Sequence, residues 1–485
     1  MSRGISLLVA VFLAITSFNL ASAQSVKTNR WIKDFEQVRT AIARHYADLD
    51  EALEKQGINP TALNNVTLRA IRNAKSDGEA RLALQAFVTA FGDRRLSLGK
   101  AVRQPLSLKR DEALMMIAEA GPVCGSLRFN KYDPEPYGLG VLEDYAFNVL
   151  VSINNVFGAG IVEAGPRGVG YVRVPSFRTQ DYYSACLRAW RNLQAEREEP
   201  CDGDCLEDMT DRIIPNMLID DFARRIESFS ERRVGTVIID LTGTNGNGRW
   251  ASSLATLLAG DAISCPTVQV PRSSDWRKRF SAMSKDLGRV KGDGSVESLT
   301  DAGRDQLSQL EDQTRQTCRR PENLWTDAEF DRDSCQGLTT ASLTSCGLLS
   351  RSPNVEIESR SASEILFQPD YYSIAPSPKP AKIFVVIDEE TSGAAEELAA
   401  MLQDAVAATI VGKTSAGSGC VPVPGEDSRV VLRRSGLQLN VPNCRVLRED
   451  GSNAAAGVSP DEPVGWTGDA NSNDAREAVF EAILP

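Results

Sequence analysis

Apolar runs and amphipathic stretches alternate through the second half of the chain, and this alternation predicts the fold. Residues 222–260 read as a helix, a buried strand over 234–241, a loop rich in Gly and Asn, and a second helix. Residues 384–419 read as a strand, a turn of small residues, an amphipathic helix, another strand and a Gly-rich loop. Strands that alternate with helices in this way predict an α/β fold with a largely parallel sheet.

The remaining segments divide the chain into further units. Apolar residues recur at helical spacing from Trp31 to Ile42, and residues 24–100 are predicted to form an N-terminal helical unit. Residues 101–168 have β-type composition broken by Gly and Asn, which fits either a small β module or strands that lead into the next domain. The α/β core is predicted over 169–485. Residues 266–353 are charged and poor in apolar runs, so they are predicted to interrupt the core as a helical insertion.

The first 23 residues have the features of a secretory signal peptide. They carry one Arg, an apolar run over residues 5–18 and the small-residue ending Ala-Ser-Ala, which predicts cleavage before Gln24. A membrane anchor is the alternative, but the run is short and interrupted by polar residues. No later segment is long and apolar enough to span a bilayer. We therefore expect an exported protein, periplasmic or extracellular.

Cysteine content and charge limit the classes of function further. All ten cysteines follow the signal segment, and an even number in an exported chain predicts disulfides. Two pairs are close enough in sequence to be candidates: Cys201 with Cys205, and Cys420 with Cys444. The chain contains a single histidine, so we predict no metal site and no cofactor. The net charge of −11 argues against a nucleic-acid partner.

Two loops could carry chemistry. Residues 239–248 and 388–397 each follow a predicted buried strand and open a helix, so both loops would lie at the carboxyl edge of the sheet. Backbone amides of Gly246, Asn247 and Ala394 could form an oxyanion hole there. The alternative is that these Gly and Asn residues only turn the chain and cap helices.

Four segments in order resemble one family of peptidases. They are "GYVRVPSF", "VIIDLTGTNGNG", "IFVVIDEETSGAAEELAAMLQDAVAATIVGKTSAGSG" and "GVSPDEPV". Together they resemble the C-terminal-processing, or tail-specific, serine protease family, in the branch that includes tricorn core and interphotoreceptor retinoid-binding-protein-like domains. The resemblance implies a crotonase-like α/β spiral core, an N-terminal helical unit and a peptide or protein C-terminal tail as partner. The family often carries a PDZ module, but residues 101–168 show no clear PDZ pattern.

The chain departs from this family at three chemical positions. The family's nucleophilic Ser stands three residues before a Glu, which here is Glu396, so the nucleophile position is Gly393. Asp404 matches a family aspartate and supports this register. The Lys of the family's Ser/Lys dyad falls on Ser418. The related "GDGH" turn is "GDRR" here, which places Arg95 at the His position.

These departures leave two main functional hypotheses. A glycine has no side chain to attack a carbonyl, and a serine without a nearby base stays protonated. The first hypothesis is therefore a pseudoprotease that binds extended peptides by strand addition without cutting them. The alternative is a serine-type endopeptidase that uses a displaced nucleophile such as Ser392, although Ser at this place is also a typical helix N-cap. Other crotonase-fold chemistry on acyl thioesters fits poorly with an exported, disulfide-bearing chain.

Overall fold

The structure is a computed structural model of the 485-residue chain. It describes residues 28–100, 119–139, 147–150, 156–163, 168–196, 201–315, 323–327, 337–340, 343–353, 355, 357, 359–372, 378–420, 428–467 and 472–484. The predicted signal peptide lies outside the described residues, as do Cys318 and Cys335.

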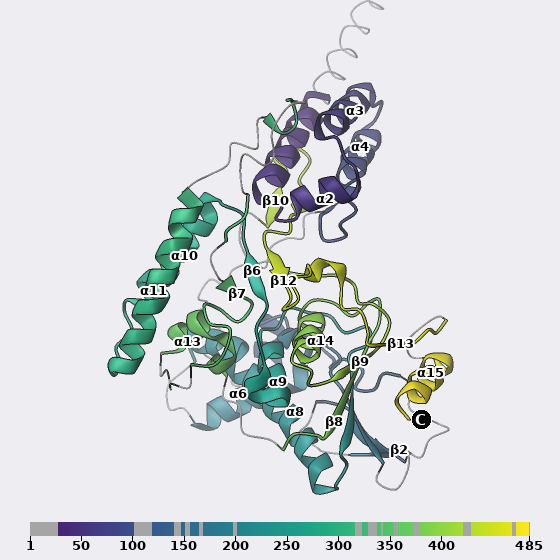
Figure 1. Ribbon diagram of the computed structural model, residues 1–485, viewed down its shortest axis with the longest axis vertical. Coiled ribbons are helices and arrows are strands. Elements are labelled where there is room, and N and C mark those ends of the chain that lie inside the picture. The colour runs from purple at the N-terminus through teal and green to yellow at the C-terminus, as the bar shows by residue number, and fades with distance from the viewer. Residues whose placement is uncertain are drawn as a thin grey trace, which may run out of the picture.

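A seven-stranded mixed sheet forms the centre of the α/β core (Figure 1). Its strands, in spatial order, are β13 (Glu462–Pro463), β9 (Thr409–Gly412), β8 (Lys382–Ile387), β5 (Thr236–Asp240), β4 (Val169–Arg173), β3 (Ala159–Val162) and β2 (Phe147–Val149). The pairings from β13 to β4 are parallel. Strands β3 and β2 then extend the sheet in antiparallel fashion, so the described strands of residues 101–168 belong to the main sheet.

Helices cover both faces of this sheet, which explains its continuous apolar strands. Val237 and Ile239 of β5 pack in the larger core cluster with α8 (Ile214–Glu231), α9 (Trp250–Ala259) and α14 (Ala394–Asp404). Ile238 lies between them in sequence and faces the opposite cluster, which contains α15 (Asn473–Ile483). Because successive strand residues point to opposite faces, a strand that is buried on both faces must be apolar at every position.

The N-terminal helical unit is completed by a segment from the far end of the chain. It contains a helix over residues 28–45, then α2 (Leu49–Lys55), α3 (Pro60–Asn73), α4 (Asp77–Thr89) and β1 (Ser97–Lys100). Strand β1 pairs with β11 (Leu437–Asn440), which pairs with β10 (Arg429–Val431). Leu432, Leu437 and Leu439 of this hairpin are buried in the same cluster as Phe35 and Phe87. The unit therefore depends on residues about 340 positions later in the chain.

The predicted insertion is largely helical where it is described. Helices α10 (Ser274–Leu287) and α11 (Gly294–Arg315) form a projecting pair (Figure 1). Beside them a small sheet joins β12 (Arg445–Leu447), β6 (Thr267–Gln269) and β7 (Leu343–Thr344). Further described helices are α5 (Ala120–Ser126), α6 (Tyr183–Glu196), α7 (Gly203–Asp208), a π-helical turn over Met209–Ile213 and α13 (Arg360–Leu366).

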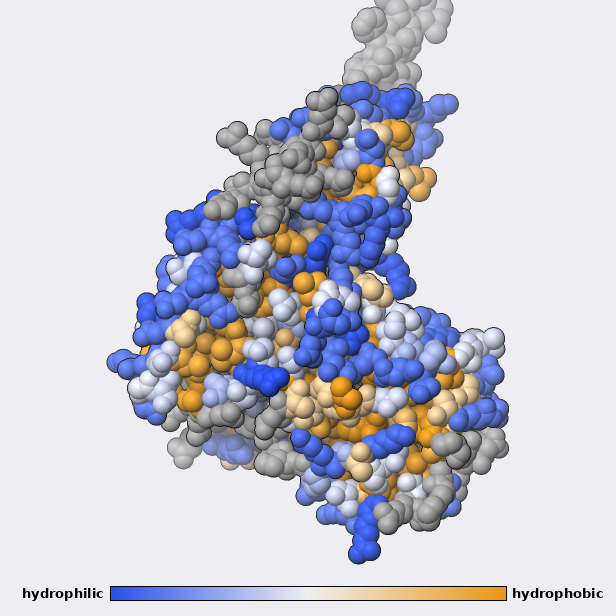
Figure 2. Space-filling view, in the orientation of Figure 1, coloured by the Kyte–Doolittle hydropathy of each residue, from blue (hydrophilic) through white to orange (hydrophobic). Residues whose placement is uncertain are grey.

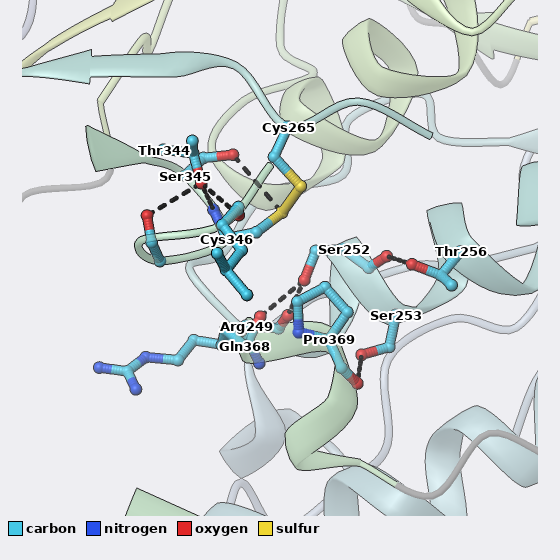
Figure 3. The surroundings of a disulfide bond; sticks show 12 residues. Arg249, Ser252, Ser253, Thr256, Cys265, Thr344, Ser345, Cys346, Gln368 and Pro369 are labelled. Carbon is cyan, nitrogen blue, oxygen red and sulfur yellow. Dashed lines mark hydrogen bonds between the residues drawn. A yellow bond between two sulfur atoms is a disulfide. The ribbon is translucent and has the colours of Figure 1, made fainter. Parts of the chain in front are cut away.

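Among the described residues, four disulfides connect these parts. They join Cys124 to Cys186, Cys201 to Cys205, Cys265 to Cys346 and Cys420 to Cys444. Both pairs singled out from the sequence are among them, and Cys420–Cys444 encloses the β10–β11 hairpin. Figure 3 shows Cys265–Cys346 beside α9, where Gln368 accepts a hydrogen bond from Ser252 at 2.7 Å. Several disulfides indicate folding in an oxidising compartment. No helix among the described residues meets the length and hydropathy needed to cross a membrane.

Candidate functional site

The two predicted loops lie side by side at the carboxyl ends of β5 and β8. The carboxylate of Asp388 accepts the Gly243 N–H at 2.9 and 3.0 Å and the Thr391 N–H at 2.9 Å. The Ser392 N–H donates to the Thr244 carbonyl at 3.0 Å. These bonds fix the turn after β8 against the Gly/Asn-rich loop after β5. The structure thus brings together the two loops that the sequence placed at this edge.

Gly393, which the sequence predicts to occupy the family's nucleophile position, has a backbone conformation and a contact that only glycine permits. Its φ of 65° and ψ of −127° lie in a region that residues with a Cβ rarely adopt. A Cβ at this position would lie 2.1 Å from the Gly246 carbonyl oxygen. That carbonyl also accepts the Ala394 N–H at 2.8 Å. The backbone around position 393 is therefore closed against a side chain.

The same contact bears on the predicted oxyanion hole. The Ala394 amide is engaged by Gly246, so in this arrangement it does not point at a free acceptor site. Within the described part of the chain, the amides of Gly246 and Asn247 have no hydrogen-bond acceptor. Asn247 is exposed and Gly246 is half-buried. A role of these amides in binding an oxyanion remains a prediction.

Glu396 connects helix α14 to the loop that carries the dyad Lys position. Its side chain is 4% exposed and accepts the Gly417 N–H at 2.8 Å and the Ser418 N–H at 2.7 Å. The hydroxyls of Ser415 and Ser418 donate to the same carboxylate. Ser418 Oγ also accepts the Gly393 N–H at 2.5 Å. Ser418 therefore joins Gly393 to Glu396, because its hydroxyl accepts a hydrogen bond from the one and donates a hydrogen bond to the other.

The remaining site residues occupy the two ends of α14. The N-cap residue of the helix is Gly393, so the expectation that Ser392 caps it is wrong. Ser392 is half-buried, and its hydroxyl forms no hydrogen bond to any described residue. At the other end, Asp404 pairs with Arg448 at 2.5 Å, with both side chains largely buried. This ion pair holds the end of α14 against the segment after β12.

Arg95, at the family's His position, is held in a charge cluster. Its guanidinium donates to Asp48 at 2.6 Å and to Asp93 at 2.7 Å. Tyr46 also donates to Asp93, at 2.9 Å. Burial alone would raise the pKa of Asp93, but the hydrogen bonds and charge of Arg95 outweigh it and lower that pKa. The pKa of Arg95 is raised above its usual value because the two carboxylates outweigh its own desolvation.

The cluster continues from the helical unit into the core. Asp48 accepts from Arg445 at 2.7 Å and from Asn453 at 2.9 Å, and Asn453 also donates to Glu51 at 2.8 Å. Asp48 is only 4% exposed. Charged groups buried to this extent are retained when they are paired and hydrogen-bonded, as they are here. The cluster therefore fastens two units whose residues are about 400 positions apart in sequence.

A polar cavity of about 490 Å³ lies beside this cluster, between the helical unit and the core. The core contributes its wall from the loop that holds Ser415 and Gly417 and from Ala455, and the helical unit contributes Lys55 and Arg94. Sequence reasoning did not predict this cavity. The "GDRR" turn supplies Arg94 and Arg95 to its lining and is a local sequence signal for it. The single histidine of the chain, His45, is the last residue of the helix over residues 28–45 in the helical unit.

No metal site accompanies these groups among the residues that the structure describes. Nowhere there are three His, Cys, Asp or Glu side chains grouped as metal ligands would be.

Comparisons with known proteins agree on a peptidase fold. The family model described as peptidase family S41 matches residues 213–464. Two structures of mature CPAF, one of them complexed with lactacystin, superpose with TM-scores of 0.55 and 0.54 at 15% identity. The alignments cover 95% of this chain and 96% and 97% of those chains. A putative peptidase from Parabacteroides merdae gives a TM-score of 0.45 at 12% identity over 94% of this chain and 96% of its own. No curated protein sequence matched.

Proposed function

Because the chain belongs to peptidase family S41, we propose that it is an exported member of the family that binds extended peptides or protein C-terminal tails without hydrolysing them. Its core is proposed to be the crotonase-like spiral of the tail-specific proteases. The disulfides and the predicted signal peptide favour a periplasmic or extracellular location.

The proposal that the chain does not hydrolyse peptides rests on one observation. The nucleophile position is occupied by Gly393, and the Gly246 carbonyl fills the space that a side chain would need. A covalent mechanism requires a nucleophile within hydrogen-bond reach of a base. Ser418, at the dyad Lys position, has a neutral hydroxyl that is bonded to Glu396, and Arg95 stays protonated at any physiological pH. None of the three altered positions supplies a nucleophile or a base.

The cavity supports retention of binding. It adjoins the loop of residues 414–417, which is bonded through Glu396 to the turn that holds Gly393. Its volume of about 490 Å³ is within the range of sites that hold small ligands or a few residues of a peptide. Polar side chains line much of it, and they could pair with peptide groups that lose their water on binding. A peptide bound here would lie next to the family's catalytic turn.

Ser392 supports the alternative of an active endopeptidase. Its hydroxyl is half-buried and forms no hydrogen bond to a described residue, so it could reach a bound carbonyl. No base lies within hydrogen-bond distance of that hydroxyl in the described structure. The displaced nucleophile therefore needs a base from the bound peptide or from another chain, and for this reason it is the second candidate.

Labelling with a serine-directed fluorophosphonate separates the two functions. Wild type and Ser392→Ala would be compared with an active family member, and any adduct would be located by mass spectrometry. We expect no adduct on folded wild type. An adduct on Ser392 that disappears in the variant would overturn the pseudoprotease proposal. Binding would be measured in parallel by fluorescence anisotropy with pools of labelled decapeptides, and no binding by any pool would refute peptide recognition.

A further inference from the structure

The carboxylates that line the polar cavity between the helical unit and the core already have partners within the protein. Asp93 accepts four hydrogen bonds, three of them from Arg95. Asp48 accepts from Arg95, Arg445 and Asn453. Glu51 is paired with Lys55 at 2.5 Å and with Arg445 at 3.3 Å. These acceptors have little capacity left for a ligand.

Glu389, at the rim, is also paired. It meets Lys413 Nζ at 3.1 Å, and Lys413 in turn lies over the Trp466 ring. The pKa of Glu389 is lowered by hydrogen bonding to its own backbone amide and by Lys413. The negative charge at the rim is therefore balanced by a cation that is itself held in place.

The groups with spare hydrogen-bonding capacity are donors. Arg94 is exposed, and in the described structure its guanidinium makes one hydrogen bond, from Nη2 to the Ala416 carbonyl at 2.6 Å. A guanidinium has five N–H donors, so most of them remain available. The Lys55 side chain is 66% exposed, and an exposed ion pair such as Lys55–Glu51 holds its members weakly. Arg94 therefore has free donors at the cavity, while the carboxylates that line it are paired, and Lys55 adds positive charge at the rim while it stays paired with Glu51.

We propose that this cavity binds a carboxylate of the peptide ligand, with Arg94 as the binding residue and Lys55 as a second cation at the rim. That the ligand is a peptide rests on the proposed function, whereas its carboxylate group is inferred from the cavity alone. The fork of a guanidinium matches the two oxygens of a carboxylate. The bond to Ala416 holds Arg94 at the cavity wall, so little side-chain freedom is lost on binding. Figure 2 shows a largely hydrophilic surface where the helical unit meets the core, as a charged ligand group requires.

The carboxylate could be a chain terminus or an acidic side chain, and three pools of fluorescein-labelled decapeptides distinguish these sources. One pool has a free C-terminal acid and no Asp or Glu, the second is amidated and contains Asp and Glu, and the third is amidated and contains neither. We expect the third pool to bind at least about tenfold more weakly than the better of the other two. Equal binding of all three pools would overturn the proposal.

Variants then test the named residue. Arg94→Gln should weaken binding of the preferred pool about tenfold, and Arg94→Lys should retain part of it because the charge remains. Arg69→Gln is the matched control, since Arg69 is an exposed arginine of α3 outside the cavity. Circular dichroism would confirm that each variant is folded. Wild-type affinity in Arg94→Gln would overturn the assignment.

The carboxylate site can be tested even if no peptide binds. If no pool binds, the proposed function fails, and succinate then serves as the probe in thermal unfolding. Protection of wild type but not of Arg94→Gln would uphold the carboxylate site without a peptide. Equal protection of the two proteins, or no protection of either, would overturn it.

Discussion

Replacement of Gly393 by Ala tests whether the nucleophile position is closed. Alanine introduces a single methyl group, whose carbon would lie 2.1 Å from the Gly246 carbonyl oxygen. The backbone conformation alone costs a non-glycine residue about 1–3 kcal/mol. Moving a packed carbonyl away adds about 1–3 kcal/mol of overpacking. Loss of its hydrogen bond from Ala394 adds about 1 kcal/mol. The unfolding free energy should therefore fall by about 3–7 kcal/mol.

Gly260 is a matched control for the backbone contribution. Its φ of 62° and ψ of −138° are close to those of Gly393. The atom nearest to an added Cβ is Lys379 Nζ at 2.2 Å, the far end of a flexible side chain that can turn aside. Gly260→Ala should therefore show little more than the conformational cost, about 1–3 kcal/mol. The difference between the two variants isolates the contact with Gly246.

Urea unfolding of the oxidised proteins provides the measurement. Fluorescence and circular dichroism should be followed together, because a chain of this length can unfold in more than one transition. The closed position predicts a clearly larger loss for Gly393→Ala than for Gly260→Ala. A difference below about 0.5 kcal/mol, which is typical of surface substitutions, would refute the claim that Gly246 blocks a side chain.

Three further predictions concern charge and covalent links. Arg95→Ala should reduce the unfolding free energy by about 3 kcal/mol near neutral pH, because it leaves Asp93 without its cation and removes one of the two cations that pair with Asp48. Since Arg95 lowers the folded-state pKa of Asp93, this contribution is present above the ordinary Asp pKa and lost as the pH falls through the lowered value. Acid titration of stability should therefore show a smaller loss in the variant than in wild type. Burial raises the folded-state pKa of Glu397, so this group's contribution to stability is lost as the pH rises through the raised pKa. Glu397→Gln should therefore raise the unfolding midpoint at pH 7.5 but not at pH 4. Equal effects at the two pH values would contradict this. The disulfide Cys265–Cys346 closes a loop of 81 residues, and replacing both cysteines by serine should lower the unfolding free energy by about 4.5 kcal/mol. The same replacement of Cys201–Cys205, whose sequence separation is 4, should lower it by about 2 kcal/mol. Similar losses for the two variants in calorimetry would disprove the dependence on loop length.

The parts of the fold with local signals could be predicted from sequence, and those that depend on distant contacts could not. The apolar runs of β5 and β8 and the small-residue turns after them are local, and their pairing at one sheet edge follows from parallel topology. The docking of the β10–β11 hairpin into the helical unit has no local signal, because β1 and β11 are short strands that meet only in the fold. The partners of Asp48 were missed for the same reason, since Arg445 and Asn453 lie far away in sequence.

Two of the three altered positions, Gly393 and Ser418, are linked by structure, and this linkage limits how reactivity could be restored there. Gly393 donates its N–H to Ser418, Ser418 donates to Glu396, and the Gly246 carbonyl lies where the nucleophile's Cβ would stand. A serine at 393 therefore requires movement of Gly246. A lysine at 418 would lose the hydroxyl that accepts the Gly393 N–H, and it would bring a cation next to the buried carboxylate of Glu396. Each single reversal disturbs a contact that the other positions supply. We therefore expect neither Gly393→Ser nor Ser418→Lys alone to react with a fluorophosphonate, and reaction of either single variant would show that the turn is more adaptable than its hydrogen bonds imply.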